Sequence, residues 1–221
     1  MPALAHDSAT KFLRAFGGAE LVVVAQQTNA LVVSALKGDR WQTVGRIEDR
    51  LIAPQCYRDQ SGAVWIHSYE GVIYRVADGR TERHDFARRI NTDRPSYVPY
   101  PPRDVLESGA GEVSFVPRFG AAARGAVTNR LDTYRAGAWD SVELGESQPG
   151  ASCVDADGRL WLASEAGLRR VGGPDTTISF DGLASDEIRP LCVRRFADGV
   201  FVLLWSRNAN GKINRFKTLE N

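Results

Sequence analysis

One stretch of the chain occurs twice. Residues 153–171 read CVDADGRLWLASEAGLRRV, and residues 56–76 read CYRDQSGAVWIHSYEGVIYRV. In both stretches an Asp is followed three residues later by Gly and six residues later by Trp, and a second Gly and an Arg-Val pair come after the Trp. A chain that repeats a short unit stacks the copies side by side. The repeat therefore constrains the architecture more strongly than any single residue does.

Each copy predicts short antiparallel strands joined by tight turns. In residues 158–164, GRLWLAS, the two leucines lie on one face of an extended strand, and Trp161 and Ala163 lie on the other. Both faces are apolar, so both must be covered. The Asp-x-x-Gly segment predicts a turn before this strand, and Gly167 predicts one after it, because glycine adopts positive φ at little cost. A small sheet that is buried on both faces needs neighbours like itself.

The same outline returns five times along the chain. Each unit has one central buried strand, and the residues near the Trp position of these strands are Val23, Trp65, Phe115, Trp161 and Val202. Their successive spacings of 42, 50, 46 and 41 residues fit the ~40 to 50 residues of a four-stranded propeller blade. We therefore predict an all-β fold, a five-bladed β-propeller with little or no helix.

The predicted propeller is a single domain over residues 1–221. Its five units span residues 10–46, 47–87, 104–145, 148–183 and 186–221. The fifth unit ends after three strands, so we predict that residues 1–8 supply its outer strand and close the ring. The alternative is that residues 1–8 fray and that packing alone holds the ring.

The motif Asp-x-x-Gly-x-Leu/Val-Trp-Leu/Ile-x-Ser-x-x-Gly-hydrophobic, at residues 59–72 and 155–168, resembles the two-component regulator propeller repeat of bacterial sensor proteins. The clear motif covers two of the five units, and the resemblance implies the fold only. In that family the repeats accompany extracytoplasmic sensing, a membrane helix and a kinase domain, none of which we expect here. The Asp-box of sialidases is set aside, because there one residue separates Asp from Gly, whereas here two do.

Composition and charge exclude several classes of protein. The chain has 28 Lys and Arg against 27 Asp and Glu, a net charge of +1, so nucleic-acid binding is not expected. No apolar stretch approaches the ~20 residues that span a bilayer, and the N-terminus lacks a signal-peptide pattern, so we expect a cytoplasmic bacterial protein without membrane contact. Cys56, Cys153 and Cys192 have no CxxC spacing. We interpret them as small buried residues, with a redox or metal role as the alternative.

Catalytic patterns are sparse. The three histidines, His6, His67 and His84, show no metal-binding spacing, and the chain has no GxSxG, phosphate-binding glycine loop or GxGxxG motif. We therefore predict no catalytic residue, no metal and no cofactor. Asp59 and Asp155 are predicted to cap the backbone of their turns. Trp65 and Trp161 are predicted to be core residues, and His67 to be a structural group or else to point into the central channel.

Three long segments are predicted to converge on one face. In a four-stranded blade, the loop between strands two and three and the crossing to the next blade open on the same side. The Pro-rich crossing 87–103 and the hairpins 117–128 and 205–211 fall there, and long loops on a rigid scaffold are frequently functional. Their Tyr, Trp and Arg side chains are typical of protein interfaces. The candidate partner-binding residues are Tyr97, Tyr100, Arg103, Arg118, Phe119, Arg124, Trp205, Arg207 and Asn208.

The predicted function is non-enzymatic binding of a protein partner by a monomeric adaptor, inhibitor or immunity-type protein. A structural alternative is that the Pro-rich crossing only covers an exposed blade edge. A second functional class is carbohydrate, either a lectin or a glycosidase whose two channel carboxylates lie ~5 to 9.5 Å apart. A lectin would need near-identical pockets in every blade, and these units diverge. A third possibility is a sensor or structural fragment that completes a larger ring by oligomerisation.

Overall fold

Every regular element of the described residues is a β-strand. The computed structural model describes residues 10–68, 72–85, 102, 104–108, 111–116, 130–144, 151–155, 157–164, 167–171, 177–178, 188–196, 199–206 and 217–218. No helix in this part of the chain is long and apolar enough to cross a membrane. The strands form five antiparallel sheets, four of four strands and one of three, and the all-β prediction is confirmed. The chain divides into two compact units, Met1–Pro101 and Pro102–Asn221.

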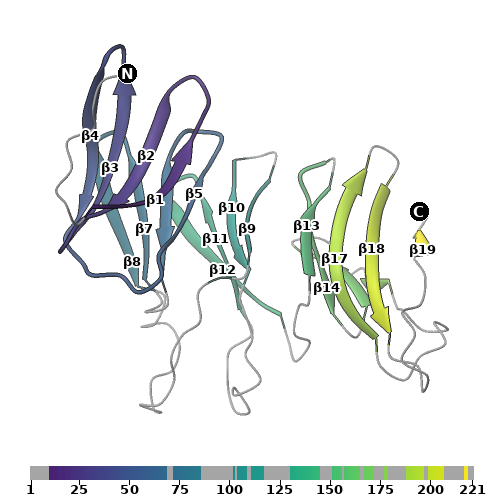
Figure 1. Ribbon diagram of the computed structural model, residues 1–221. Helices are drawn as coiled ribbons and strands as arrows, with labels where there is room; N and C mark the ends of the chain where they lie inside the picture. Colours follow the sequence, from purple (N-terminus) through teal and green to yellow (C-terminus); the bar gives the residue numbers. More distant parts are fainter. Residues whose placement is uncertain are drawn as a thin grey trace, which may run out of the picture. The chain divides into compact units, whose positions relative to one another are not determined.

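The first unit contains two sheets (Figure 1). The first sheet consists, in spatial order, of β1 (Lys11–Phe16), β2 (Leu21–Gln26), β3 (Leu31–Lys37) and β4 (Arg40–Ile47). The second consists of β5 (Gln55–Arg58), β6 (Val64–His67), β7 (Val72–Ala77) and β8 (Arg80–Asp85). Each strand pairs with the next strand in sequence, so each sheet is a meander of the kind that forms a propeller blade.

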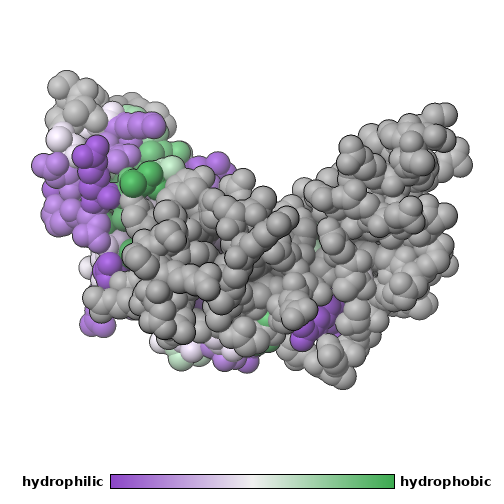
Figure 2. Space-filling view, turned by 90° about the horizontal axis from the view of Figure 1, so that it is seen from below, coloured by the Kyte–Doolittle hydropathy of each residue, from purple (hydrophilic) through white to green (hydrophobic). Residues whose placement is uncertain are grey.

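The core of the first unit lies between its two sheets. Alternate residues of β2 and β3 pack against alternate residues of β6 and β7, and the buried cluster includes Val22, Val24, Leu31, Val33, Val64, Ile66, Val72 and Val76. Gly45 of β4 marks a close approach, because a Cβ there would lie 2.3 Å from Val76 Cγ1. Hydrophilic residues cover most of the coloured surface of this unit in Figure 2, and most residues of the outer strand β4 are at least partly exposed.

The second unit contains three sheets. The third sheet consists of β9 (Asp104–Glu107), β10 (Val113–Val116), β11 (Arg130–Arg135) and β12 (Ala138–Glu143). The fourth consists of β13 (Ala151–Val154), β14 (Leu160–Ser164), β15 (Gly167–Arg170) and β16 (Thr177–Ile178). The fifth consists of β17 (Ile188–Phe196), β18 (Gly199–Ser206) and β19 (Lys217–Thr218). The first strand of the fourth sheet contacts the first strands of both neighbouring sheets.

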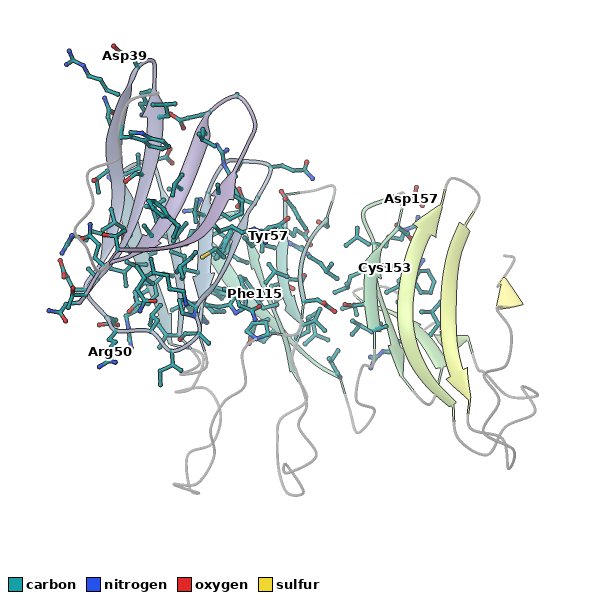
Figure 3. All side chains as sticks on the ribbon, in the orientation of Figure 1. Asp39, Arg50, Tyr57, Phe115, Cys153 and Asp157 are labelled. Atoms are coloured by element: carbon teal, nitrogen blue, oxygen red, sulfur yellow. The ribbon has the colours of Figure 1, made fainter. Side chains whose placement is uncertain are left out.

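Leucines and valines hold the third and fourth sheets together. Leu160 and Leu162 of β14 pack against a cluster from the third sheet that contains Val116, Leu131 and Leu144. Because side chains alternate along a strand, Trp161 lies on the opposite face of the fourth sheet, as predicted. The third sheet carries a separate aromatic cluster, which Figure 3 marks by Phe115. It consists of Phe115, Tyr134 and Trp139, with ring centroids 5.5 Å apart for Phe115–Trp139 and 5.3 Å apart for Tyr134–Trp139.

Two placements differ from the sequence-based expectation. Phe115 was aligned with the Trp position of the repeat, but the pairing register puts Ser114 there, one residue earlier. Trp205 was placed at the start of a hairpin, but it lies inside β18 and pairs with Arg189. The strand continues to Ser206, so any hairpin begins after that residue.

Candidate functional site

The carboxylate of Asp59 organises the turn between β5 and β6. Its Oδ1 accepts hydrogen bonds from the backbone N–H of Ala63 at 2.9 Å and from the hydroxyl of Ser61 at 2.6 Å. Its Oδ2 accepts a hydrogen bond from the indole Nε1 of Trp65 at 2.8 Å. The predicted backbone cap is confirmed, and the same carboxylate also fixes the orientation of the buried tryptophan.

Asp155 makes a similar set of contacts in the turn between β13 and β14, with a backbone N–H in place of the serine hydroxyl. Its Oδ1 accepts from the backbone N–H groups of Asp157 and Arg159 at 2.9 and 2.8 Å, and its Oδ2 accepts from Trp161 Nε1 at 2.7 Å. Burial opposes ionisation of this carboxyl, but these hydrogen bonds and the charge of Arg159 outweigh burial, so the pKa of Asp155 lies below its ordinary value. An ionised carboxylate that is fully engaged by its own turn is a structural group rather than a general acid.

The arginine of each repeat lies beside the tryptophan. Arg75 pairs with Trp65 across β6 and β7, and Arg170 pairs with Trp161 across β14 and β15. The Arg75 guanidinium carbon lies 5.7 Å from the centroid of the Trp65 ring, a cation–π geometry. These pairings confirm the alignment of the two repeats, including the extra residue before Arg75. The conspicuous Asp, Trp and Arg of the motif thus belong to the scaffold.

Burial keeps two potentially reactive side chains, those of His67 and Cys56, in their neutral forms. His67 is 3% exposed, and burial lowers its pKa from an ordinary 6.5 to about 4, so the imidazole is neutral at pH 7. Among the described residues its Nδ1 has no hydrogen-bond partner. Burial raises the pKa of Cys56 to about 12, against the opposing charge of Arg14. Cys56 is half-buried and Cys153 is buried, and neither forms a disulfide among the described residues. The Cys56 thiol stays protonated at pH 7, and a protonated thiol is a poor nucleophile.

A cleft of about 410 Å³ opens between the third and fourth sheets. Its apolar lining comes from both sheets, with Leu106, Leu131 and Val142 on one side and Val154, Leu160 and Val171 on the other. Three hydroxyl-bearing residues of the third sheet, Ser108, Ser114 and Thr133, also line it. The volume falls within the ~300 to 1,000 Å³ of small-molecule pockets.

Two of the three arginines that line the cleft are paired with carboxylates, whereas the third, Arg170, has a buried Nε with no hydrogen-bond partner among the described residues. Arg135 lies 2.6 Å from Glu112, from Nε to Oε1, and Arg159 lies 2.9 Å from Asp157, from Nη1 to Oδ2. Asp157, labelled in Figure 3, stands in the turn between β13 and β14. Asp140 accepts a hydrogen bond from the backbone N–H of Ser141 at 2.8 Å. The cleft therefore combines apolar walls, hydroxyl groups and a rim of mixed, largely compensated charge.

The cleft lies at the strand ends opposite to those that the predicted insertion at 117–128 connects. Its rim is built from the β9–β10, β11–β12 and β13–β14 turns, whereas the insertion at 117–128 joins the other ends of β10 and β11. Of the predicted partner-binding residues, only Trp205 belongs to a described strand, and nothing is described of its side chain. The remaining predicted positions lie outside the described residues: Tyr97, Tyr100, Arg103, Arg118, Phe119, Arg124, Arg207 and Asn208.

Sequence reasoning missed the cleft, although a signal was present. The third unit repeats the spacing of the motif as Ser108-x-x-Gly111-x-x-Ser114, with serine in place of both Asp and Trp. Because Phe115 is large and apolar, it was aligned with the tryptophans in place of Ser114, the residue before it. In the described part of the chain, no group of three or more His, Cys, Asp and Glu side chains could hold a metal ion.

Meandering antiparallel sheets that pack face to face define a β-propeller type of fold. No family model and no curated protein matches the sequence. Among solved structures, the propeller YCF48 bound to D1 peptide is 16% identical, with a TM-score of 0.54 over 92% of this chain and 64% of that one. This chain thus spans less than two thirds of the length of that structure.

A second solved structure is the extracellular domain of the putative one component system BT4673 from B. thetaiotaomicron. It is 13% identical, with a TM-score of 0.49 over 84% of this chain and 25% of that one. The predicted resemblance to a propeller is confirmed at the level of the fold by the YCF48 structure.

Proposed function

We propose that the chain is a five-bladed propeller that binds a protein partner and catalyses no reaction. The observation that carries this proposal is the cleft between the third and fourth sheets. An apolar centre, hydroxyl groups and a rim of charged residues make up the composition of protein interfaces. The polar groups of the repeat motif are engaged in holding turns and tryptophans, which supports a scaffold that presents a surface.

The solved structure with the same fold supports a peptide or protein as the ligand. YCF48 is described as bound to D1 peptide, so a propeller of this type presents a surface to a polypeptide. The carbohydrate alternative gains no support from Asp59 and Asp155, because both carboxylates are hydrogen-bonded within their own turns. Protein binding is therefore the function that we propose, in an adaptor, inhibitor or immunity-type protein.

A second proposed binding surface is the face that carries the predicted insertions. Its aromatic and arginine residues are of the kinds that dominate interface energetics. The insertion at 117–128 connects the ends of β10 and β11 opposite to the cleft, so a partner that contacts only that end would not reach the cleft. The proposed residues of this surface are Tyr97, Tyr100, Arg103, Arg118, Phe119, Arg124, Trp205, Arg207 and Asn208.

Affinity capture followed by titration tests protein binding. A tagged wild-type chain is used to capture partners from the organism of origin, and the most enriched partner is then purified and titrated by calorimetry. If the insertion face binds it, Tyr100→Ala and Trp205→Ala should each weaken binding about thirtyfold, the effect of truncating a hot-spot residue. Gln42→Ala, at an exposed position of β4, is the matched control. Unchanged affinity in both variants would contradict the insertion face, and no saturable partner would contradict protein binding.

Ring closure by residues 1–8 is a further part of the proposal. The described part of the fifth sheet has three strands where the other sheets have four, and an added outer strand would cover the edge of β19. Deleting residues 1–8 should lower Tm by about 4 °C or more, at ~2 to 4 °C per kcal/mol for a chain of this size. Replacing the same residues with a Gly-Ser segment of equal length should do the same. An unchanged Tm in calorimetric scans of both variants would count against closure.

A further inference from the structure

The third sheet keeps the turn of the repeat but not its side chains. In the β9–β10 turn, the backbone N–H of Ser108 donates to Glu112 O at 2.9 Å, and that of Gly111 donates to Ser108 O at 3.0 Å. Asp59 and Asp155 make the same two backbone hydrogen bonds in their own turns. The turn glycine also has positive φ in all three, 91° at Gly62, 73° at Gly111 and 77° at Gly158. Ser108 therefore occupies the Asp position of the repeat.

Ser114 occupies the Trp position. It follows Ser108 by six residues and pairs with Leu106, two residues before Ser108. Trp65 and Trp161 stand in the same relation to the Asp of their own turns. The hydrogen-bonded Asp and Trp of the second and fourth sheets are thus replaced together by two serines in the third.

The cleft lies where the missing indole would be. Ser108 and Ser114 both line it, with Leu160 and Val171 of the fourth sheet. A small residue in place of a large one leaves unfilled volume unless the neighbouring elements collapse onto it. Collapse is opposed here, because Val116 and Leu162, which do not line the cleft, already pack in the cluster that joins the two sheets. The fold therefore holds open a space that its sister sheets fill with tryptophan.

The arginines at the cleft suit an aromatic occupant. Arg135 and Arg159 each have a carboxylate within 3 Å, whereas the buried Nε of Arg170 has no hydrogen-bond partner among the described residues. The face of an aromatic ring attracts a guanidinium group. The hydroxyl groups of Ser108, Ser114 and Thr133 are able to accept a hydrogen bond from an N–H or O–H group. Apolar walls with a few such acceptors match an indole, which pairs a large apolar ring with a single donor.

We propose that this cleft is a docking site for an aromatic side chain of the partner protein, tryptophan above all, which enters the position that the repeat otherwise gives to its own tryptophan. The inference rests on the proposed protein-binding function and names the chemistry of its contact. In the partner, the indole is presented from an exposed segment. Its ring packs against the apolar wall residues Leu106, Val142, Val154 and Val171, and its N–H meets the hydroxyl-bearing wall.

Methyl NMR with a small probe tests the cleft without the partner. N-Acetyltryptophanamide is titrated into the wild-type chain while the methyl signals of Leu131, Val142 and Leu160 are followed. These signals should shift in a saturable way, with an affinity about tenfold higher than for N-acetylleucinamide, since a buried aromatic ring contributes more contact area. Equal affinity for the two amides, or shifts located elsewhere, would overturn the proposal.

Ser114→Trp fills the cleft from within and should abolish the shifts caused by the tryptophan amide. Thr43→Trp, at an exposed position of β4, is the matched control and should bind the probe as the wild type does. Ser114→Phe is the second variant if the larger ring prevents folding. Unchanged binding of the probe in a folded Ser114 variant would overturn the proposal.

The affinity of the purified partner for wild type and for Ser114→Trp distinguishes docking in the cleft from the proposed protein-binding function. Ser114→Trp should lower the affinity for the partner about thirtyfold, as loss of a hot-spot contact does. A partner that binds wild type and Ser114→Trp equally would overturn docking in the cleft and leave protein binding standing. If no partner exists, the proposed function fails, and the tryptophan amide still decides whether the cleft accepts an indole.

Discussion

Replacing Trp65 with Ala is expected to lower the free energy of unfolding by about 4 kcal/mol, the cost of truncating a fully buried aromatic side chain. Trp65 is 1% exposed, so the substitution removes almost its entire contact surface. It also removes the N–H that Asp59 Oδ2 accepts and the ring that lies beneath Arg75. A carboxylate that loses a partner in a partly buried turn adds to the cost.

Urea denaturation measures this loss as a lower midpoint with little change in slope. Trp65→Phe keeps an aromatic ring but removes the donor, and should cost about half as much. Trp161→Ala is the matched comparison, because the same motif surrounds Trp161 but its side chain is only half-buried. Its loss in free energy of unfolding should be smaller than that of Trp65→Ala. A loss below about 1 kcal/mol in Trp65→Ala, typical of a surface substitution, would contradict the core role of this residue.

The coupling between Asp59 and Trp65 can be measured separately. A double-mutant cycle with Asp59→Ala should give an interaction energy of about 1 to 2 kcal/mol, in the range for residues that share a hydrogen bond. The same cycle at Asp155 and Trp161 should agree within error, because both pairs have the same connectivity and nearly equal distances of 2.8 and 2.7 Å.

The sequence was sufficient for the architecture of the repeat. Period-two alternation in residues 158–164 identified the face that packs on the third sheet, since Leu160 and Leu162 both lie in that contact. Asp-x-x-Gly identified the turns, because only a residue free to take positive φ fits the last turn position. The hydrogen bond between the Asp carboxylate and the indole could also have been predicted, because Trp follows Asp by six residues in both copies.

The cleft was harder to predict because it is defined by side chains that are missing. A serine at the Trp position carries no apolar signal, so Phe115 next to it was aligned in its place. The register of β9 and β10 shows that Ser114 is equivalent to the tryptophans. The predicted insertion-face residues are different, because their loops have no repeated pattern that could fix a side chain in space. The role of these residues in partner binding remains a prediction, which the binding experiments test.

Stability should fall in weakly acidic solution because of His67. Its pKa is lowered to about 4 in the folded chain, where burial disfavours the charged imidazolium, and is ~6.5 in an unfolded chain. Below pH 6.5 the unfolded chain therefore binds more protons at this site than the folded chain does. The contribution of His67 is fully present above pH 6.5 and is lost as pH falls toward 4.

The size of this effect follows from the difference between the two pKa values. At ~1.4 kcal/mol per unit, roughly 2 to 3 kcal/mol should be lost between pH 7.5 and 4.5. The test is the free energy of unfolding across this range for wild type, His67→Gln and His67→Leu. Carboxylates also titrate at the acidic end, so the decisive quantity is the difference between wild type and variants.

That difference should change by roughly 2 to 3 kcal/mol in favour of the variants as pH falls. The residues next to His67 explain why its charged form is not stabilised. The cross-strand partners of His67 are Gln55 and Ile73, so neither flanking strand offers a carboxylate in register to stabilise an imidazolium. Gln and Leu carry no titrating group and should give flatter profiles. If wild type and both variants show parallel profiles from pH 7.5 to 4.5, His67 is not a neutral buried imidazole, and the environment assigned to it is wrong.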